Sequence, residues 1–222
     1  MTGASPGRRM ARISESTVRR LSHYYRVLEE VAGEGQRVIS SHRLAEREGV
    51  TSAQVRKDLS CFGSFGRRGL GYDVRHLREQ IRGILGLSRR WRVAIAGAGH
   101  IGSALLAYRG FGEQGFDVVA VFDSSPQRIG RPAGDLAVRP MNSLSARDAI
   151  DVGVVATPPG AAQDVADAMV AAGVRGILNF APRKLHVPAA VALRHVEMTV
   201  ELESLSFALS QPRAGRRPRA VE

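Results

Sequence analysis

The chain has 222 residues, of which 44% are hydrophobic, and its formal net charge is +11. The charge is segregated, since residues 1–92 carry a net +10, residues 93–211 a net −2 and residues 212–222 a net +3, so a nucleic acid is the leading partner and an anionic membrane surface the alternative. A single cysteine excludes an intrachain disulfide, and the histidines lack metal-ligand spacing. With no apolar run of the ~20 residues that span a bilayer and no signal peptide, the sequence predicts a cytoplasmic protein without a metal or membrane anchor.

The composition predicts two folded domains between two flexible tails. Residues 1–13 and 212–222 are rich in Gly, Pro and Arg and offer little to bury, which is typical of tails. Between them we place a basic domain at 14–86, an α/β domain at 87–198 and a C-terminal helix at 199–211.

The first predicted element is an amphipathic helix over residues 14–33. Apolar side chains recur there at spacings of three and four residues, which places them on one helical face: Val18, Leu21, Tyr25, Leu28 and Ala32. After Gly35, either Ser40 or Ser41 can cap the next helix, because both side chains accept a hydrogen bond from a free backbone N–H.

Two short helices then predict a helix-turn-helix. A turn at Gly49 separates a helix ending at Glu48 from one that Thr51 can cap and that runs to about Cys61. In such a unit the second helix enters the major groove, where Gln reads adenine and Arg or Lys reads guanine or holds phosphate. The candidate DNA contacts are polar residues of this helix: Ser52, Gln54, Arg56 and Lys57.

A glycine-rich segment follows the second helix directly. Glycines between Gly63 and Gly71 allow a tight β-turn that would hold Arg67 and Arg68 at the tip of a wing. A wing beside a recognition helix can reach the adjoining minor groove. The alternative is an ordinary solvated basic face on a small helical packing unit, but the charge segregation favours a winged helix-turn-helix.

The second half of the chain contains a dinucleotide fingerprint. An apolar strand from Val93 to Ala96 turns into a helix through a G-x-G-x-x-G run: Gly97, Ala98, Gly99, His100, Ile101 and Gly102. The first glycine permits the tight turn, the second lets the backbone approach a pyrophosphate, and the third lets the helix pack closely. A second apolar strand ends at Asp123, where a carboxylate binds the ribose hydroxyls and repels a 2′-phosphate, which favours NAD over NADP.

Further strands and helices alternate after this fingerprint. A buried strand stops at Thr157 and Pro158, a helix runs to about Ala172, and another strand lies near 176–178 and ends at Asn179. This order predicts a Rossmann-like parallel sheet with its ligand at the carboxyl ends of the strands. We therefore expect Thr157, Pro158 and Asn179 to line the crevice. Loop hydrogen bonding explains Thr157 and Asn179 equally well, and an α/β domain that has lost its ligand is the alternative for the whole fingerprint.

The sequence resembles the Rex family of redox-sensing transcriptional repressors over roughly residues 14–211. The most specific match is the stretch from Gln54 to Tyr72, which resembles that family's recognition helix and wing. Supporting matches lie at 97–102, 108–112, 178–182 and 201–207. The resemblance implies a homodimer that binds a double-stranded DNA operator when it is free or bound to NAD⁺ and releases the operator when NADH binds, so that NAD(H) is a regulatory ligand.

The resemblance also implies a switch and a domain-swapped C-terminal helix. Tyr108 matches a tyrosine near the nicotinamide, Arg26 an arginine of the first helix, and Glu197 an acidic position just before the swapped helix. A carboxylate that pairs with the tyrosine in one state and the arginine in the other could rotate the domains. Glu197 is one methylene longer than the aspartate common there, and Met198 stands where some members have phenylalanine, so we expect altered local packing.

Two other functions fit parts of the sequence. A NAD-dependent dehydrogenase with a basic extension would carry the same fingerprint, but no substrate-binding domain follows the sheet and no Lys or His is convincingly placed as a hydride-transfer acid or base. A structural nucleoid or membrane-surface protein needs only the basic block. The two matched domains in this order favour an α/β DNA-binding repressor that is not an enzyme.

Overall fold

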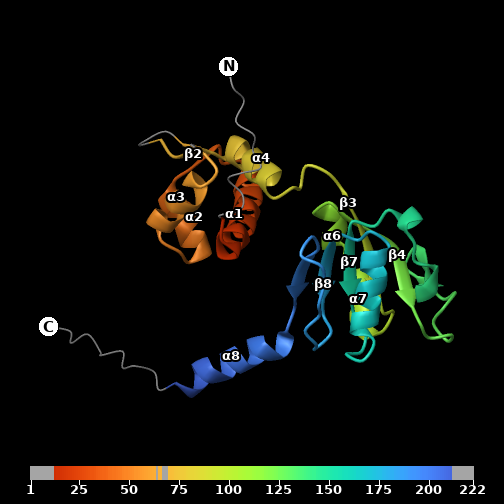
Figure 1. The fold of residues 1–222 in the computed structure, drawn as a ribbon. Coiled ribbons are helices and arrows are strands. Elements are labelled where there is room, and N and C mark those ends of the chain that lie inside the picture. The colour runs from red at the N-terminus through yellow and green to blue at the C-terminus, as the bar shows by residue number, and fades with distance from the viewer. Residues whose placement is uncertain (1–12, 64, 67–69, 212–222) are drawn as a thin grey trace. The chain divides into compact units, whose positions relative to one another are not determined.

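The computed structural model describes residues 13–63, 65–66 and 70–211 (Figure 1). The chain divides into two compact units, Met1–Arg89 and Arg90–Glu222. Arg67 and Arg68 lie outside the described residues, as do both predicted tails apart from Ile13.

Helices dominate the described part of the first unit, together with a small two-stranded sheet. Its elements in chain order are α1 (Glu15–Gly33), β1 (Val38–Ile39), α2 (Ser41–Glu48), α3 (Ser52–Ser60), β2 (Tyr72–Asp73) and α4 (Val74–Ile84). β1 pairs antiparallel with β2, so the strand that follows the predicted wing is joined to the strand before α2.

Each helix of this unit begins at a polar side chain that accepts a hydrogen bond from the backbone N–H three residues on. The four caps are Ser14, Ser40, Thr51 and Asp73. These bonds satisfy N–H groups that the first helical turn leaves without partners. Ser40, rather than Ser41, therefore caps α2, and Thr51 caps α3 as the sequence predicts.

The core of the first unit lies along α1. Its fully buried face includes Leu21, Tyr24 and Leu28, which pack with apolar residues of α2, α3 and α4. The prediction for Val18 was wrong, because its side chain is 41% exposed. Tyr24 was left out of the predicted face, although its ring belongs to the core and its hydroxyl finds a partner in Asp58.

The second unit contains a seven-stranded sheet in the order β5-β6-β4-β3-β7-β8-β9. Neighbouring strands are parallel except for β5 and β6. The strands are β3 (Trp91–Ala96), β4 (Phe116–Asp123), β5 (Pro132–Ala133), β6 (Leu136–Pro140), β7 (Val152–Val155), β8 (Gly176–Asn179) and β9 (Ala192–His195). The sequence predicted β3, β4, β7 and β8 and missed the three outer strands, which are short or partly exposed.

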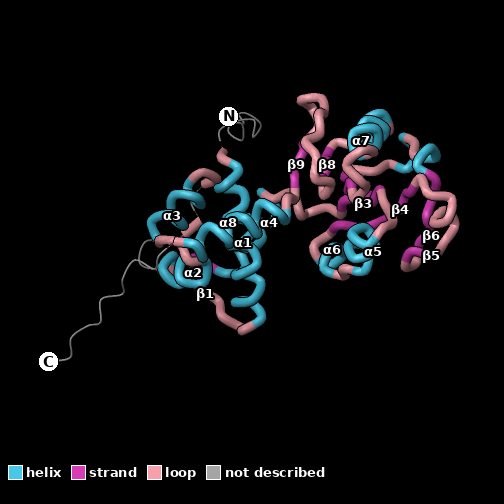
Figure 2. Tube along the Cα trace, turned by 90° about the horizontal axis from the view of Figure 1, so that it is seen from below, coloured by secondary structure: helices cyan, strands magenta, loops and turns pink. Residues whose placement is uncertain are grey.

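Helices cover both faces of this sheet. They are α5 (His100–Ala107), α6 (Gly110–Glu113) and α7 (Ala162–Ala171), with two short 3₁₀ turns at Met141–Ser143 and Ala146–Asp148. Figure 2 shows α7 on one face and α5 and α6 on the other. Side chains alternate along β3, so that Val93 and Ile95 pack on the α5 side while Ala94 and Ala96 pack on the α7 side.

The centre of the sheet is the point where the strand order reverses. β3 pairs with β4 on one side and with β7 on the other. The chain therefore leaves β3 and β7 in opposite directions, which opens a crevice at their carboxyl ends. This is the edge at which the fingerprint glycines and Asp123 lie.

The C-terminal helix, α8 (Met198–Ser210), exposes all of its side chains. They include six large apolar ones: Met198, Val200, Leu202, Leu205, Phe207 and Leu209. α8, like the other helices in the described ranges, falls short of the length and apolarity needed to cross a membrane.

Candidate functional site

The predicted recognition helix, α3, is fixed to its unit by one apolar face. Val55 and Leu59 are buried, as their spacing predicts. On the other faces Arg56 and Lys57 are exposed, while Ser52 and Gln54 are half-buried. These are the four residues that the sequence predicts as DNA contacts, and all four lie within the short helix α3.

A buried carboxylate, Asp58, ties α3 to α1. Arg20 donates from Nε to Oδ2 at 2.6 Å and from Nη2 to Oδ1 at 2.7 Å, and the Tyr24 hydroxyl donates to Oδ2 at 2.9 Å. Gln54 Nε2 donates to Oδ1 at 2.8 Å. Burial favours the neutral acid, but the hydrogen bonds from Arg20, Gln54 and Tyr24 outweigh it and hold the pKa of Asp58 below its usual value.

Sequence reasoning missed this network. The signal was present, because Asp58 lies between Val55 and Leu59 on the apolar side of α3 and a buried acid needs a cationic or hydrogen-bonding partner. Nothing in the sequence identified Arg20 as that partner, since it lies a whole helix away.

The predicted basic contacts of α3 differ in how they are held. Arg56 Nη1 donates to the Ser41 hydroxyl of α2 at 3.0 Å. The Lys57 side chain is exposed, and its ammonium has no partner within the described part of the chain. The wing-tip predictions for Arg67 and Arg68 fall outside that part, so they stay predictions.

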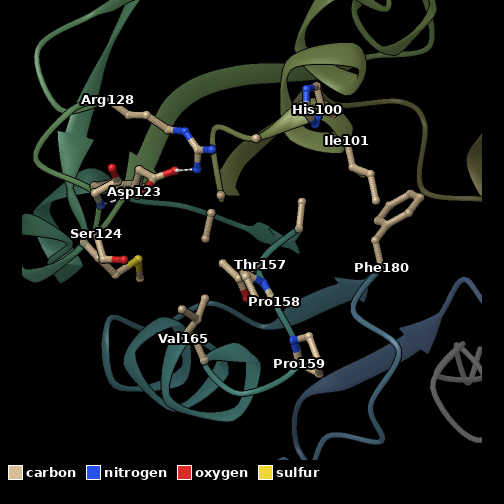
Figure 3. A pocket seen from close by; sticks show the side chains of 18 of the residues that line it. His100, Ile101, Asp123, Ser124, Arg128, Thr157, Pro158, Pro159, Val165 and Phe180 are labelled. Carbon is tan, nitrogen blue, oxygen red and sulfur yellow. Dashed lines mark hydrogen bonds and ion pairs between the residues drawn. The ribbon is translucent and has the colours of Figure 1, made fainter.

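The second candidate site is a pocket of about 490 Å³ at the carboxyl ends of the strands (Figure 3). Four segments contribute to its lining: the ends of β3, β4 and β7 and the segment after β8. Figure 3 shows Asp123, Ser124 and Arg128 at one end and Ile101 and Phe180 at the other. The pocket is thus polar at one end and apolar at the other, and its volume falls in the range of ligand sites.

The glycine loop forms the middle of this pocket, and two of its glycines are sterically required. Gly97 has φ +101°, and a Cβ there would collide with the Ala156 carbonyl. A Cβ on Gly102 would collide with the Gly97 carbonyl oxygen. By contrast, a Cβ on Gly99 would meet only Arg128, at 3.9 Å. Gly99 therefore leaves open space at the start of α5, where backbone N–H groups favour an anion.

Asp123 is held by the backbone of two loops. Its Oδ2 accepts from the Ala98 N–H at 2.8 Å and its Oδ1 from the Ser125 N–H at 2.8 Å. Arg128, which sequence reasoning missed, donates to Oδ2 at 3.3 Å. Burial raises the pKa of Asp123, but the bonds from Ser125, Ala98 and Arg128 outweigh it and keep that pKa below the usual value.

The ends of β7 and β8 contribute differently from each other. Thr157 and Pro158 line the pocket as expected, and the Thr157 hydroxyl is buried without a hydrogen-bond partner among the described residues. Asn179 does not line it. The Asn179 side chain is fully buried and bonded to Ala181, Arg183 and His195, so the loop-bonding alternative holds for this residue.

The remaining predicted residues divide between the pocket and its surroundings. His100 and Ile101 line the pocket; Ala98 and Gly102 support it from behind. Tyr108 does not line it, is 61% exposed and packs edge-on against Phe111 with ring centroids 5.2 Å apart.

The other two residues of the implied switch, Arg26 and Glu197, are exposed. Arg26 belongs to the first unit and Glu197 to the second. In the described ranges, no group of three or more His, Cys, Asp or Glu side chains has the arrangement of a metal site.

Comparisons with known proteins decide the family. Residues 12–60 match the family model "Putative DNA-binding protein N-terminus", and residues 88–183 match "CoA binding domain". The redox-sensing transcriptional repressor Rex of Carboxydothermus hydrogenoformans is 48% identical over 199 residues, which cover 88% of this chain and 96% of that protein. The chain belongs to the Rex family. The Rex of Thermus thermophilus is 44% identical over 204 residues, or 91% of this chain and 96% of that protein.

Rex-family structures share the fold of this chain. The structure of RSP, a Rex-family repressor, in complex with β-NAD⁺ and operator DNA superposes with a TM-score of 0.85 at 38% identity, covering 89% of this chain and 92% of that one. RSP in complex with β-NADH gives 0.81 at 36% identity, covering 89% and 94%. The predicted fold class is confirmed, and membership of a repressor family confirms a transcriptional regulator over a dehydrogenase.

Proposed function

We propose that this Rex-family chain is a homodimeric repressor that binds double-stranded operator DNA when free or bound to NAD⁺ and releases it when NADH binds. The observation that carries the proposal is the likeness, over 89% of the chain, to the Rex-family repressor RSP in complex with NAD⁺ and operator DNA. A repressor of bacterial genes works where the DNA is, so we propose a cytoplasmic location.

In this proposal α3 and the wing form the DNA-binding surface. The exposed Arg56 and Lys57 supply positive charge for phosphates or guanine, and Gln54 supplies a carboxamide for a base edge. Ser52 lies in the first turn of α3, where its hydroxyl and the helix N-terminus favour phosphate. Arg67 and Arg68 complete the predicted set at the wing tip.

The residues of the pocket fit NAD(H) as the regulatory ligand. The fit rests on a glycine cradle that added Cβ atoms would fill and on the buried, unpartnered hydroxyl of Thr157. Asp123 would hold the adenosine ribose, since its carboxylate accepts three hydrogen bonds of the about four that it can take. The N–H groups from Gly99 to Ile101 would hold the pyrophosphate.

The opposite end of the pocket would receive the nicotinamide, against the apolar Ile101 and Phe180. When bound, the nicotinamide ring carries the redox state, being positively charged in NAD⁺ and neutral in NADH. Pro158 would close the pocket from the β7 side, between the two ends. Asn179 would act only by fixing the loop that carries Phe180.

We propose that the signal passes through Tyr108, Arg26 and Glu197. All three side chains are exposed and none is buried in a hydrophobic core, so each can exchange partners. The apolar side chains that α8 exposes support its exchange between the two protomers of a dimer. Leaving so much apolar surface in contact with water is unfavourable in free energy, and docking on a partner would bury it.

A mobility-shift assay on genomic DNA fragments tests this proposal. We expect sequence-selective binding that NADH releases and that NAD⁺ leaves intact. Selective binding that ignores both nucleotides would contradict redox sensing. Binding without sequence preference would favour a structural nucleoid protein instead.

Two single variants should separate the activities of the two units. We expect Asp123→Ala to weaken the NADH response by about 10-fold or more while DNA binding is kept, because the ribose loses its carboxylate. Arg56→Ala should weaken DNA binding and leave NADH binding unchanged. Asp135→Ala and Arg147→Ala, which remove exposed charges elsewhere, serve as controls. Loss of both activities in either test variant would indicate misfolding and contradict this separation.

A further inference from the structure

A buried carboxylate holds one of the proposed base-reading side chains. Asp58 is 2% exposed, and its Oδ1 accepts a hydrogen bond from Gln54 Nε2 over 2.8 Å. The two residues lie one turn apart on α3, so the bond is internal to the recognition helix. Gln54 remains partly exposed.

This bond decides which way the Gln54 carboxamide faces. An ionised carboxylate accepts hydrogen bonds and donates none, so Nε2 must face Asp58. The flipped amide would place Oε1 of Gln54 against Oδ1 of Asp58, which replaces a hydrogen bond with repulsion between two acceptors. In the described part of the chain, Gln54 Oε1 and its second N–H have no other partner.

Asp58 cannot turn to follow Gln54, because α1 holds its carboxylate. Arg20 donates to both oxygens, at 2.6 and 2.7 Å, and the Tyr24 hydroxyl donates to Oδ2 at 2.9 Å. A bidentate guanidinium and a phenol together fix the plane of the carboxylate. These donors also keep the pKa of Asp58 low despite its burial, so the group is ionised at neutral pH.

We propose that Asp58 is a positioning residue that sets the base preference of Gln54. The free Oε1 and the free N–H form the acceptor and donor pair that matches N6 and N7 of adenine in the major groove. A glutamine that could flip would present either order of donor and acceptor and would discriminate less between bases. The inference rests on the proposed function, in which α3 reads DNA.

The test measures base preference and not overall affinity. An operator that the wild-type protein selects from random duplexes is varied one base pair at a time. Binding is then measured for the wild type, Gln54→Ala, Asp58→Asn and the double variant.

We expect the wild type to prefer A·T at one position of each half-site by roughly 10- to 100-fold. Gln54→Ala should lose this preference, Asp58→Asn should lose most of it, and the double variant should lose no more than Gln54→Ala. Tyr24→Phe removes one donor to Oδ2 and leaves the Gln54 bond in place, so this control should retain the preference.

The outcomes separate this proposal from the proposed function. If Asp58→Asn weakens binding to all duplexes equally and keeps the adenine preference, Asp58 only supports the fold and the inference is overturned. If the wild type selects no duplex, the proposed function fails instead. Should Asp58→Asn not fold, hydrogen exchange of the wild-type Gln54 carboxamide decides. Exchange slower than that of the exposed Gln80 supports the bond, and equal exchange overturns it.

Discussion

The two units hold their functional groups by opposite means. In the first unit a buried side-chain network around Asp58 joins α3 to α1. In the second unit the backbone positions the functional groups, because glycines shape the loop and the N–H groups of Ala98 and Ser125 donate hydrogen bonds to Asp123. The first unit should therefore be destabilised when a charged side chain of the network is removed. The second should be destabilised when a Cβ is added at a glycine of the loop.

The largest expected effect is that of Asp58→Ala on the first unit. Removing one partner of a buried pair leaves Arg20 and Tyr24 without their acceptor, so we expect a loss of about 3–5 kcal/mol in the free energy of unfolding. Chemical denaturation with far-UV circular dichroism measures it. Glu79→Ala, at a half-exposed surface position, should cost less than about 0.5 kcal/mol. A loss below about 1 kcal/mol for Asp58→Ala would show that the network is not what holds α3.

The same network predicts an acid dependence. The folded-state pKa of Asp58 lies below its unfolded value, so the ionised carboxylate stabilises the fold at pH values above about 4. That stabilisation is lost as the pH falls through the lower, folded-state pKa. Asp58→Asn should therefore flatten the decline of stability in this acidic range, as measured by denaturation at a series of pH values. An unchanged acid limb would mean that other carboxylates control it.

Gly102→Ala tests the backbone arrangement of the second unit. Because its Cβ would collide with the Gly97 carbonyl, we expect a loss of about 1–3 kcal/mol in stability and of most NADH binding, measured by thermal unfolding and NADH fluorescence. Gly99→Ala is the matched control, since its Cβ meets only Arg128 at 3.9 Å. This control should keep its stability and lose NADH affinity alone. Equal stability losses in both variants would contradict a specific steric requirement at Gly102.

The same contrast explains which features the sequence could predict. A backbone conformation or close contact that only glycine tolerates is visible in the sequence, so the fingerprint could be located. The apolar runs on either side of it located the central strands and the end of β4 at Asp123. The caps at Thr51 and Ser40 were visible for a similar reason, since the residue type and the position both matter.

Side-chain partners that are far apart in the sequence could not be predicted in this way. Arg20 and Asp58 are 38 positions apart, and nothing local to either residue indicates the other. Asn179 was misplaced for a related reason. Its position at the end of β8 is shared by ligand-binding and loop-bonding residues, and only the surrounding carbonyls of Ala181 and Arg183 show which it is.

Arg128→Gln should have the smallest effect and tests whether a charge matters in the backbone-built site. The Arg128 side chain is 50% exposed, so losing its pair with Asp123 should cost less than about 1 kcal/mol. The pKa of Asp123 should rise slightly and remain low, because the Ser125 and Ala98 N–H bonds persist. Since Arg128 partly neutralises Asp123, the variant should also reject NADPH more strongly relative to NADH, by about 3-fold or more, in parallel fluorescence titrations. A larger loss of stability than for Gly102→Ala would mean that charge, and not backbone, organises this pocket.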